Sequence, residues 1–216
     1  ELRSNRLDEH LATRIRTSFV FAGPLLARMG GICVPAPGGD VIGERRLDTH
    51  VHALRKLGAE IHFERGVFVI SAPKLVGTSI LLSEASVTAT DNALLASVLA
   101  KGTTIINNAA SEPHVQNLCE MLIAMGAIID GVGSNRLTVQ GVEKLHGCET
   151  TVGADYIESV SWVAASVLTG GQIRVTQADP HVLGMVELVF ARLGVSWTVE
   201  GNDLLVPSSH RLTIEP

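Results

Sequence analysis

Met125-Gly126-Ala127 is one of three copies of a short signature that recur at a fixed interval along the chain. Leu57-Gly58-Ala59 precedes it and Leu193-Gly194-Val195 follows it, so the central glycines are 68 residues apart in both steps. Two equal intervals indicate an internal repeat, which has to be recognised before a fold is assigned. Three repeat units of this length account for nearly all of the 216 residues.

Each repeat unit shows the same order of predicted elements. A helix rich in small apolar residues ends at a glycine, and a β-branched strand follows. A proline then opens a second helix, because proline is tolerated in the first helical turn. Two short strands close the unit. In the second unit the predicted elements are a strand over 79–82, a helix over 91–101, a strand over 103–108, a helix from Pro113, and strands over 127–130 and 136–139.

The third unit repeats this order, with a helix over 156–169, a strand over 172–176 and a second helix opened by Pro180. Strands that alternate with helices in this way are typical of an α/β fold. We therefore expect three βαβαββ units of about 68 residues, in which helices cover the sheets.

The composition is that of a globular chain, with 46% apolar and 18% charged residues. Its 22 acidic and 17 basic residues give a net charge of −5, which does not favour nucleic-acid binding. No apolar run approaches the roughly 18 residues of a membrane span, and the N-terminus lacks the apolar stretch of a signal peptide. We therefore expect a cytoplasmic protein that binds neither nucleic acid nor a membrane.

The metal-binding residue types are not arranged as ligands. Cys33, Cys119 and Cys148 fit no zinc or redox spacing, so we expect buried, reduced thiols. His50 and His52 are two residues apart on a predicted helix and point to different faces, which does not suit chelation. We expect neither a metal nor a cofactor.

The first repeat unit has a longer loop than the others. From the glycine that ends its first helix to the glycine of the signature it has 28 residues, against 24 in the other two units. The extra residues fall within 35–48, where glycines let backbone N–H groups approach a ligand and Arg45 and Arg46 suit phosphate or carboxylate. The segment is thus a candidate anion site; the alternative is a surface loop with solvated arginines.

Four stretches of the chain carry specific motifs: Ala22-Gly-Pro-Leu-Leu-Ala-Arg-Met-Gly30, Pro37-Gly-Gly-Asp-Val-Ile-Gly-Glu-Arg45, Leu47-Asp-Thr-His50 and Lys101-Gly-Thr-Thr-Ile-Ile-Asn-Asn-Ala-Ala110. Together they resemble the UDP-N-acetylglucosamine enolpyruvyl transferase (1-carboxyvinyltransferase) family. The resemblance runs from about Ile15 to Pro207 and covers the second, third and fourth of the family's six βαβαββ units.

The resemblance implies about half of a two-lobed enzyme whose lobes are inverse α/β barrels. Residues 1–150 would be two units of the catalytic lobe, and residues 151–216 would be one unit of the second lobe. The family transfers the enolpyruvyl group of phosphoenolpyruvate to the 3-hydroxyl of UDP-N-acetylglucosamine, an early step of peptidoglycan and cell-wall synthesis on which cell shape and division depend. The family's first and fifth units carry further site residues, so we expect the 216 residues alone to be inactive.

The resemblance assigns the proton donor to Asp40, where the family usually has a cysteine. Aspartate has an unperturbed pKa of about 3.9, so burial or a neighbouring phosphate has to raise the pKa of Asp40 before it can donate. The same replacement removes the thiol that fosfomycin attacks. We therefore expect the intact enzyme to be insensitive to fosfomycin.

The remaining substrate-contacting residues follow from the same resemblance. Arg16 and Arg45 match arginines that contact the phosphate-bearing substrates. The first nucleotide stretch, which holds the uridine, consists of Arg45, Arg46, Leu47, Asp48 and Thr49. The second nucleotide stretch consists of Glu84, Ala85, Ser86 and Val87, in which Ser86 would donate to a phosphate.

Two of these assignments have alternatives. Ser86 can act simply as a helix N-cap, and an exposed arginine is more often solvated than functional. Glu84 stands where many family members have lysine, and a carboxylate beside a diphosphate is unfavourable.

Glu84 therefore keeps a second function open, that of a nucleotide-sugar-binding or structural relative without turnover. A related transferase that acts on a shikimate phosphate is a third possibility, against which the nucleotide stretches argue. Unpaired lobe faces could also drive self-association. Asp155 and Glu158 are expected at a helix N-terminus, and Trp162 and Trp197 in the core or between lobes.

Overall fold

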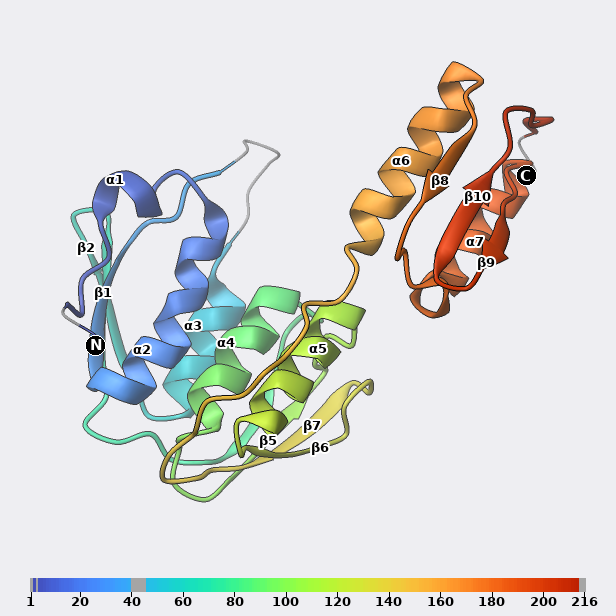
Figure 1. Cartoon of the computed structure of the whole chain (residues 1–216). Coiled ribbons are helices and arrows are strands. Elements are labelled where there is room, and N and C mark those ends of the chain that lie inside the picture. Colours follow the sequence, from blue (N-terminus) through green and yellow to red (C-terminus); the bar gives the residue numbers. More distant parts are fainter. Residues whose placement is uncertain (1, 3, 40–45, 214–216) are drawn as a thin grey trace. The chain divides into compact units, whose positions relative to one another are not determined.

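The computed structural model describes residues 2, 4–39 and 46–213. The chain divides into an N-terminal part, Glu1–Thr150, and a C-terminal part, Thr151–Pro216 (Figure 1). Each part has its own cluster of buried apolar residues.

The N-terminal part contains two sheets. Its strands are β1 (Gly31–Pro35), β2 (Glu60–Glu64), β3 (Val67–Ser71), β4 (Ser79–Leu81), β5 (Thr103–Asn107), β6 (Ile128–Asp130) and β7 (Arg136–Gln140). The first sheet has the order β1-β3-β2, and both pairs are antiparallel. The second has the order β4-β5-β7-β6, in which only the β4–β5 pair is parallel. Because side chains alternate along a strand, Ile80, Ile106 and Leu137 lie on the same buried face.

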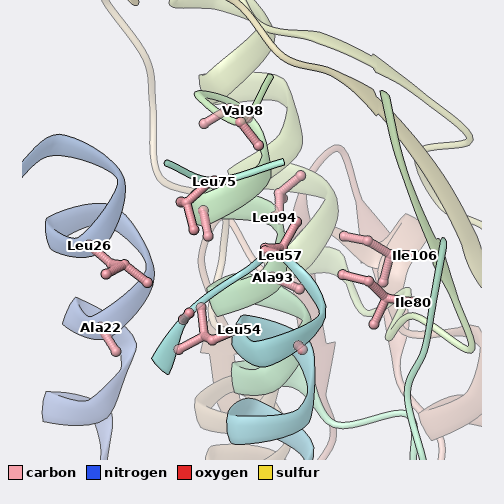
Figure 2. Packing of buried hydrophobic residues seen from close by; sticks show 14 of the residues in the cluster. Ala22, Leu26, Leu54, Leu57, Leu75, Ile80, Ala93, Leu94, Val98 and Ile106 are labelled. Carbon is pink, nitrogen blue, oxygen red and sulfur yellow. The ribbon is translucent and has the colours of Figure 1, made fainter. Parts of the chain in front are cut away.

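Helices pack against one face of each sheet. They are α1 (Glu9–Ala12), the 3-10 helix η1 (Arg16–Phe21), α2 (Ala22–Met29), α3 (Asp48–Lys56), α4 (Val87–Ser97) and α5 (Pro113–Ala124). Helix α4 contacts α2, α3 and α5, and small residues around its surface allow this burial. Figure 2 shows five residues of one apolar cluster: Leu26 of α2, Leu57 at the end of α3, Leu94 of α4, Ile80 of β4 and Ile106 of β5.

Gly23 lies where α2 comes very close to α4. A Cβ atom on Gly23 would lie 2.5 Å from the carbonyl oxygen of Asn92, so a larger residue does not fit without movement of the backbone. The Gly23 N–H donates to Asn92 Oδ1 at 2.7 Å, within the core. The side chain of Asn92 is therefore oriented by the backbone of a neighbouring helix.

The C-terminal part is smaller. It contains α6 (Tyr156–Thr169), β8 (Ile173–Val175), the 3-10 helix η2 (Pro180–Val182), α7 (Gly184–Arg192), β9 (Thr198–Glu200) and β10 (Asp203–Val206). Its sheet has the antiparallel order β8-β10-β9. Val163, Leu183, Leu204 and Val206 form most of its buried cluster. Leu168 and Met185 are 81% and 72% exposed, so much apolar surface stays uncovered in this part.

The α/β class expected from the sequence is confirmed, and several boundaries agree. Helix α6 covers 156–169 as predicted, and Gly170 caps it in the left-handed conformation. Helix α5 begins at Pro113 as predicted. In the described C-terminal residues no strand precedes α6, whereas β4 precedes α4 in the N-terminal part.

Two predicted helices were wrong in detail. Helix α4 covers 87–97 instead of 91–101, because Ser86 provides the N-cap: its Oγ accepts the Ala89 N–H at 3.4 Å. Pro180 opens only the short 3-10 helix η2, and α7 begins at Gly184.

The expectations for individual side chains had mixed outcomes. The three cysteines are free; Cys119 is buried, but Cys148 is exposed, so the expected burial was wrong there. Asp155 caps α6 by accepting from the N–H groups of Ile157 and Glu158. Trp162 is 53% exposed and is not a core residue, whereas Trp197 is half-buried against the C-terminal cluster.

None of the helices in the described residues combines the length and the apolar character that a membrane span requires.

Candidate functional site

Arg16 lies next to both ends of the long loop. It begins η1, and its Nη2 donates to the carbonyl oxygen of Arg46 at 3.0 Å. On the other side of the loop, a Cβ atom on Gly39 would lie 3.4 Å from the backbone nitrogen of Arg16. A Cβ atom on Gly38 would clash with the carbonyl oxygen of Thr13. The two glycines therefore permit the close approach that brings the loop to Arg16.

Asp40 and Arg45 lie outside the described residues, which exclude 40–45. The predicted proton donor and one of the predicted phosphate contacts therefore remain predictions. The described neighbours on either side, Gly39 and Arg46, both lie next to Arg16.

Arg46 and Asp48 form an ion pair at the start of α3. The distance from Arg46 Nε to Asp48 Oδ2 is 2.6 Å, and both side chains are about two-thirds exposed. Asp48 occupies the first turn of the helix, where the helix dipole favours a negative charge. An exposed pair of this kind adds little stability, so its main effect is to orient the Arg46 guanidinium.

Thr49 connects the first nucleotide stretch to the second. Its buried hydroxyl lies 2.9 Å from Ser83 Oγ, and it donates to Glu84 Oε1 at 3.3 Å. Since the Thr49 hydroxyl has a single proton, donation to Glu84 leaves Ser83 as the donor to Thr49. Glu84 is exposed, but its carboxylate accepts a hydrogen bond from Thr49.

The rest of the second stretch forms the start of α4. Ala85 is exposed, Ser86 is the N-cap and Val87 is the first helical residue. The alternative interpretation of Ser86 as an N-cap is thus confirmed. That role uses only a lone pair of the hydroxyl, so its proton stays available for an acceptor such as a phosphate oxygen. Both interpretations of Ser86 are compatible.

Leu47 anchors the first stretch in the core. It precedes α3 and packs, half-buried, against the main apolar cluster. Leu47 therefore contributes apolar packing, while Arg46 and Asp48 on either side of it are exposed.

His50 is a buried residue of this region for which no sequence motif predicted a role. It is 3% exposed, its Nε2 lies 3.2 Å from Thr88 Oγ1, and its Nδ1 lies 2.9 Å from Asn92 Nδ2. Burial, and then the charge of Arg16, lower the pKa of His50 to about 4. The spacing of His50 with Ala53, Leu54 and Leu57 on one helix face was the signal that could have indicated its burial.

A second group of perturbed side chains lies between α4 and α5. Burial, and then the charge of Glu112, raise the pKa of Asp91 to about 7. Among the described residues, Asp91 Oδ1 and Glu112 Oε2 are buried without a hydrogen-bond partner. Burial, followed by the charge of Asp91, raises the pKa of the Cys119 thiol to about 11. No motif in the sequence indicated this group.

These contacts bring most of the predicted site residues together. Arg16 contacts the first stretch, and Thr49 joins that stretch to the second. Helices α3 and α4 both begin here, and a helix N-terminus favours an anion. With a guanidinium, two hydroxyl groups and helix N-termini, the region can bind an anionic ligand. Within 2, 4–39 and 46–213, no group of three or more His, Cys, Asp or Glu side chains is placed to hold a metal.

A fold of this kind is found in a known family of transferases. A sequence model of the EPSP synthase (3-phosphoshikimate 1-carboxyvinyltransferase) family matches residues 2–216. Because the match covers almost the whole chain, the chain belongs to this family.

Curated relatives are more specific in name. A UDP-N-acetylglucosamine 1-carboxyvinyltransferase from Treponema denticola is 50% identical over 99% of this chain, which covers 50% of that relative. One from Bradyrhizobium diazoefficiens is 46% identical over 99% of this chain, which covers 49% of it. The chain thus spans about half the length of the curated relatives it matches.

Solved structures support the fold. The enolpyruvyl transferase NikO from Streptomyces tendae matches 94% of this chain, which covers 49% of it, with a TM-score of 0.79 and 22% identity. An EPSP synthase from Acinetobacter baumannii matches 91% of this chain, which covers 47% of it, with a TM-score of 0.62 and 23% identity. At these identities the likeness concerns the fold alone, which is the mixed α/β fold of enolpyruvyl transferases.

Proposed function

We propose that this chain is part of an enzyme that transfers the enolpyruvyl group of phosphoenolpyruvate to the 3-hydroxyl of UDP-N-acetylglucosamine. The observation that carries the proposal is the contact of Thr49 with Ser83 and Glu84, which joins the two stretches matched to nucleotide contacts. Relatives that are 44–50% identical bear the name of this activity, which favours it over transfer to a shikimate phosphate.

The nucleotide sugar would bind along both stretches. Arg46, Leu47, Asp48 and Thr49 would hold the uridine, and the hydroxyl of Ser86 would donate to the diphosphate. Arg16 would contact the phosphate-bearing substrates with its permanent charge, which suits a phosphate. Arg45 would share this role.

Asp40 would donate a proton to the methylene carbon of phosphoenolpyruvate. Carbon 2 of the enol then becomes electrophilic, and the sugar 3-hydroxyl attacks it while a base takes its proton. Loss of phosphate and of a methyl proton from the resulting tetrahedral intermediate restores the double bond in the product. Asp40 follows Gly39, which lies beside Arg16, and this supports its placement near a bound phosphate.

The charge of Arg16 by itself would favour the ionised form of Asp40, which cannot donate. A bound phosphate offsets that charge and favours the protonated carboxyl group. On this proposal, Asp40 becomes a competent acid only when phosphoenolpyruvate is present. An aspartate also lacks the thiol that fosfomycin alkylates, so the enzyme would be insensitive to that compound.

We further propose that the three 68-residue repeat units are βαβαββ units of inverse α/β barrel lobes. Residues 1–150 would form two units of the catalytic lobe, and residues 151–216 one unit of the second lobe. The recurring strand orders β1-β3-β2, β5-β7-β6 and β8-β10-β9 support the repeat. The 216 residues would be inactive without the remaining units, and the complete enzyme would act in the cytoplasm in peptidoglycan precursor synthesis.

A second candidate is a relative that binds the nucleotide sugar and does not turn it over. A structural relative that kept only the scaffold belongs to the same candidate. Glu84 favours a loss of turnover or of ligand binding, because the exposed residue carries a carboxylate at the second stretch, hydrogen-bonded to Thr49. A negative charge there weakens the binding of a diphosphate.

Calorimetric titration of the full-length protein with UDP-N-acetylglucosamine, followed by an assay with phosphoenolpyruvate, separates these candidates. We expect saturable binding and release of phosphate. Binding without phosphate release would favour a relative that only binds the nucleotide sugar. The absence of binding would contradict the proposed transferase and favour a structural relative.

A further inference from the structure

The orientation of the Asn92 amide is determined by two backbone groups. The Gly23 N–H can only donate, so the Asn92 atom that it contacts at 2.7 Å is the oxygen, Oδ1. The Phe19 carbonyl can only accept, so the atom 2.9 Å from it is the amide nitrogen, Nδ2. The two contacts agree, and together they exclude a flipped amide.

This orientation determines the tautomer of His50. The Asn92 amide nitrogen has two protons, and Phe19 takes one of them. The other faces His50 Nδ1 at 2.9 Å, so Nδ1 has to be an acceptor without a proton. A neutral imidazole then carries its proton on Nε2, where it donates to Thr88 Oγ1 at 3.2 Å.

A second proton on the ring would break this arrangement. It would sit on Nδ1, where it would face the N–H of Asn92, and two donors repel. The ring is buried, it packs edge-on against Phe19 with centroids 5.3 Å apart, and Arg16 on η1 adds a positive charge. Both effects lower the pKa of His50, in agreement with the geometry.

The ring joins the elements that carry the two nucleotide stretches. His50 is the third residue of α3 and directly follows Thr49, which ends the first stretch. Thr88 and Asn92 lie on the first two turns of α4, which begins with Ser86 and Val87 of the second stretch. Each ring nitrogen therefore ties the start of α3 to α4.

We propose that neutral His50 is a positioning residue, which holds the starts of α3 and α4 at the spacing that the nucleotide sugar requires. This inference rests on the proposed function, because it assigns UDP-N-acetylglucosamine to the two stretches. His50 does not touch the reacting atoms. Its loss therefore affects binding of the nucleotide sugar and leaves the chemical step largely unchanged.

Three variants of the full-length protein test the two nitrogens separately. His50→Phe keeps the ring packing against Phe19 and loses both hydrogen bonds. His50→Asn offers an amide oxygen close to the position of Nδ1 and so keeps an acceptor for Asn92. Thr88→Val keeps the shape of the side chain and removes only the partner of Nε2. The matched control is His52→Asn, which lies on the exposed face of the same helix.

The measurements are the KM for each substrate, kcat, and the calorimetric Kd for UDP-N-acetylglucosamine. For His50→Phe we expect the Kd and KM for the nucleotide sugar to rise about tenfold, as for the loss of two buried hydrogen bonds. We expect kcat and the KM for phosphoenolpyruvate to change by less than about threefold. Thr88→Val should show a smaller rise, His50→Asn should recover part of the loss, and His52→Asn should match the unsubstituted protein.

Two outcomes would overturn the inference. A folded His50→Phe or Thr88→Val protein with unchanged KM and Kd for the nucleotide sugar would show that the spacing does not depend on His50. A fall in kcat with unchanged KM would assign His50 to the chemical step. If the unsubstituted protein does not bind UDP-N-acetylglucosamine at all, the proposed function fails instead, so the two failures are distinguishable.

Discussion

Arg16 Nη2 lies 3.0 Å from the carbonyl oxygen of Arg46, and the backbone of Arg16 lies beside Gly39. One residue thus contacts the positions immediately before and after the segment that contains Asp40. To donate to the Arg46 carbonyl and contact a phosphate at the same time, the side chain at position 16 needs several N–H groups. Arginine has five.

Arg16→Lys should therefore impair catalysis although it keeps the charge. Lysine lacks the planar fork that could contact the Arg46 carbonyl and a phosphate together. We expect kcat/KM for phosphoenolpyruvate in the full-length protein to fall about tenfold to a hundredfold. Arg14→Lys, at an exposed position two residues away, is the matched control. Equal kcat/KM for the two variants would contradict the assigned role of Arg16.

Asp40→Asn should abolish most of the turnover, because an amide cannot donate the proton that the enol carbon needs. We expect kcat to fall by about 10²- to 10⁴-fold, the usual contribution of a general acid. Since the acid has to be protonated in the complex with phosphoenolpyruvate, kcat of the unsubstituted enzyme should decrease as the pH rises through the pKa of Asp40 in that complex. Steady-state rates from pH 5 to 9 measure both effects.

Asp40→Cys provides the complementary test. A thiol at this position should retain turnover and should make the enzyme sensitive to fosfomycin, whereas the unsubstituted protein should keep its activity after incubation with the compound. Inactivation of the unsubstituted protein, or full resistance of an active Asp40→Cys variant, would argue against Asp40 as the loop residue of the site.

Asp91 should make the folded state less stable as the pH rises. Its pKa is about 7 in the folded protein and about 3.9 when unfolded, so between these values the folded state binds more protons. The free energy of unfolding contributed by Asp91 is therefore largest below pH 4 and is lost as the pH rises through 7. Asp91→Asn removes this loss and should raise the free energy of unfolding at pH 8 by about 2 to 4 kcal/mol.

His50 has the opposite effect, because its pKa falls from about 6.5 when unfolded to about 4 when folded. Its contribution is fully present above pH 6.5 and is lost as the pH falls through 4. The two effects offset each other in the unsubstituted protein. In the Asp91→Asn variant, the free energy of unfolding measured with urea should therefore decrease as the pH is lowered from 8 to 4. A free energy of unfolding that does not change with pH in this variant would contradict the buried, neutral state of His50.

The C-terminal part should associate with a second copy of the 216-residue chain. An apolar groove in this part has Leu168 at its rim, and a large exposed apolar patch favours association. The groove is lined by Ala164, Val167, Leu168, Phe190, Leu193, Val195, Leu212 and Thr213. Leu168→Lys places a charge in the contact. We expect light scattering to show a concentration-dependent dimer that this variant abolishes, with Thr169→Lys as the exposed neighbouring control.

Where local residues dominate, the sequence predicted the structure well. Helix α6 ends at Gly170 because a glycine adopts the left-handed conformation at little cost. Helix α5 begins at Pro113 because backbone N–H groups in the first helical turn have no partner within the helix, so the missing N–H of proline costs nothing there. The predicted start of α4 was four residues too late because the range followed apolar periodicity, although Ser86 had been interpreted as a possible N-cap. Cys148 was expected to be buried and Trp162 to lie in the core or between lobes, but Cys148 is exposed and Trp162 is not in the core of the C-terminal part, because exposure depends on what packs against a side chain.

The sequence by itself indicated the 68-residue repeat and the α/β class, because glycine, proline and apolar spacing act through local backbone preferences. The family followed from four motif stretches that resemble it, and the family match confirms it. Only the tertiary structure decided that Thr49 meets Ser83 and Glu84, that Arg16 contacts Arg46, and that His50 is buried as a neutral acceptor for Asn92. These contacts join residues 30 to 42 positions apart. Hydrogen bonds and pKa shifts depend on such distances and on burial, which the packing of α2, α3 and α4 creates.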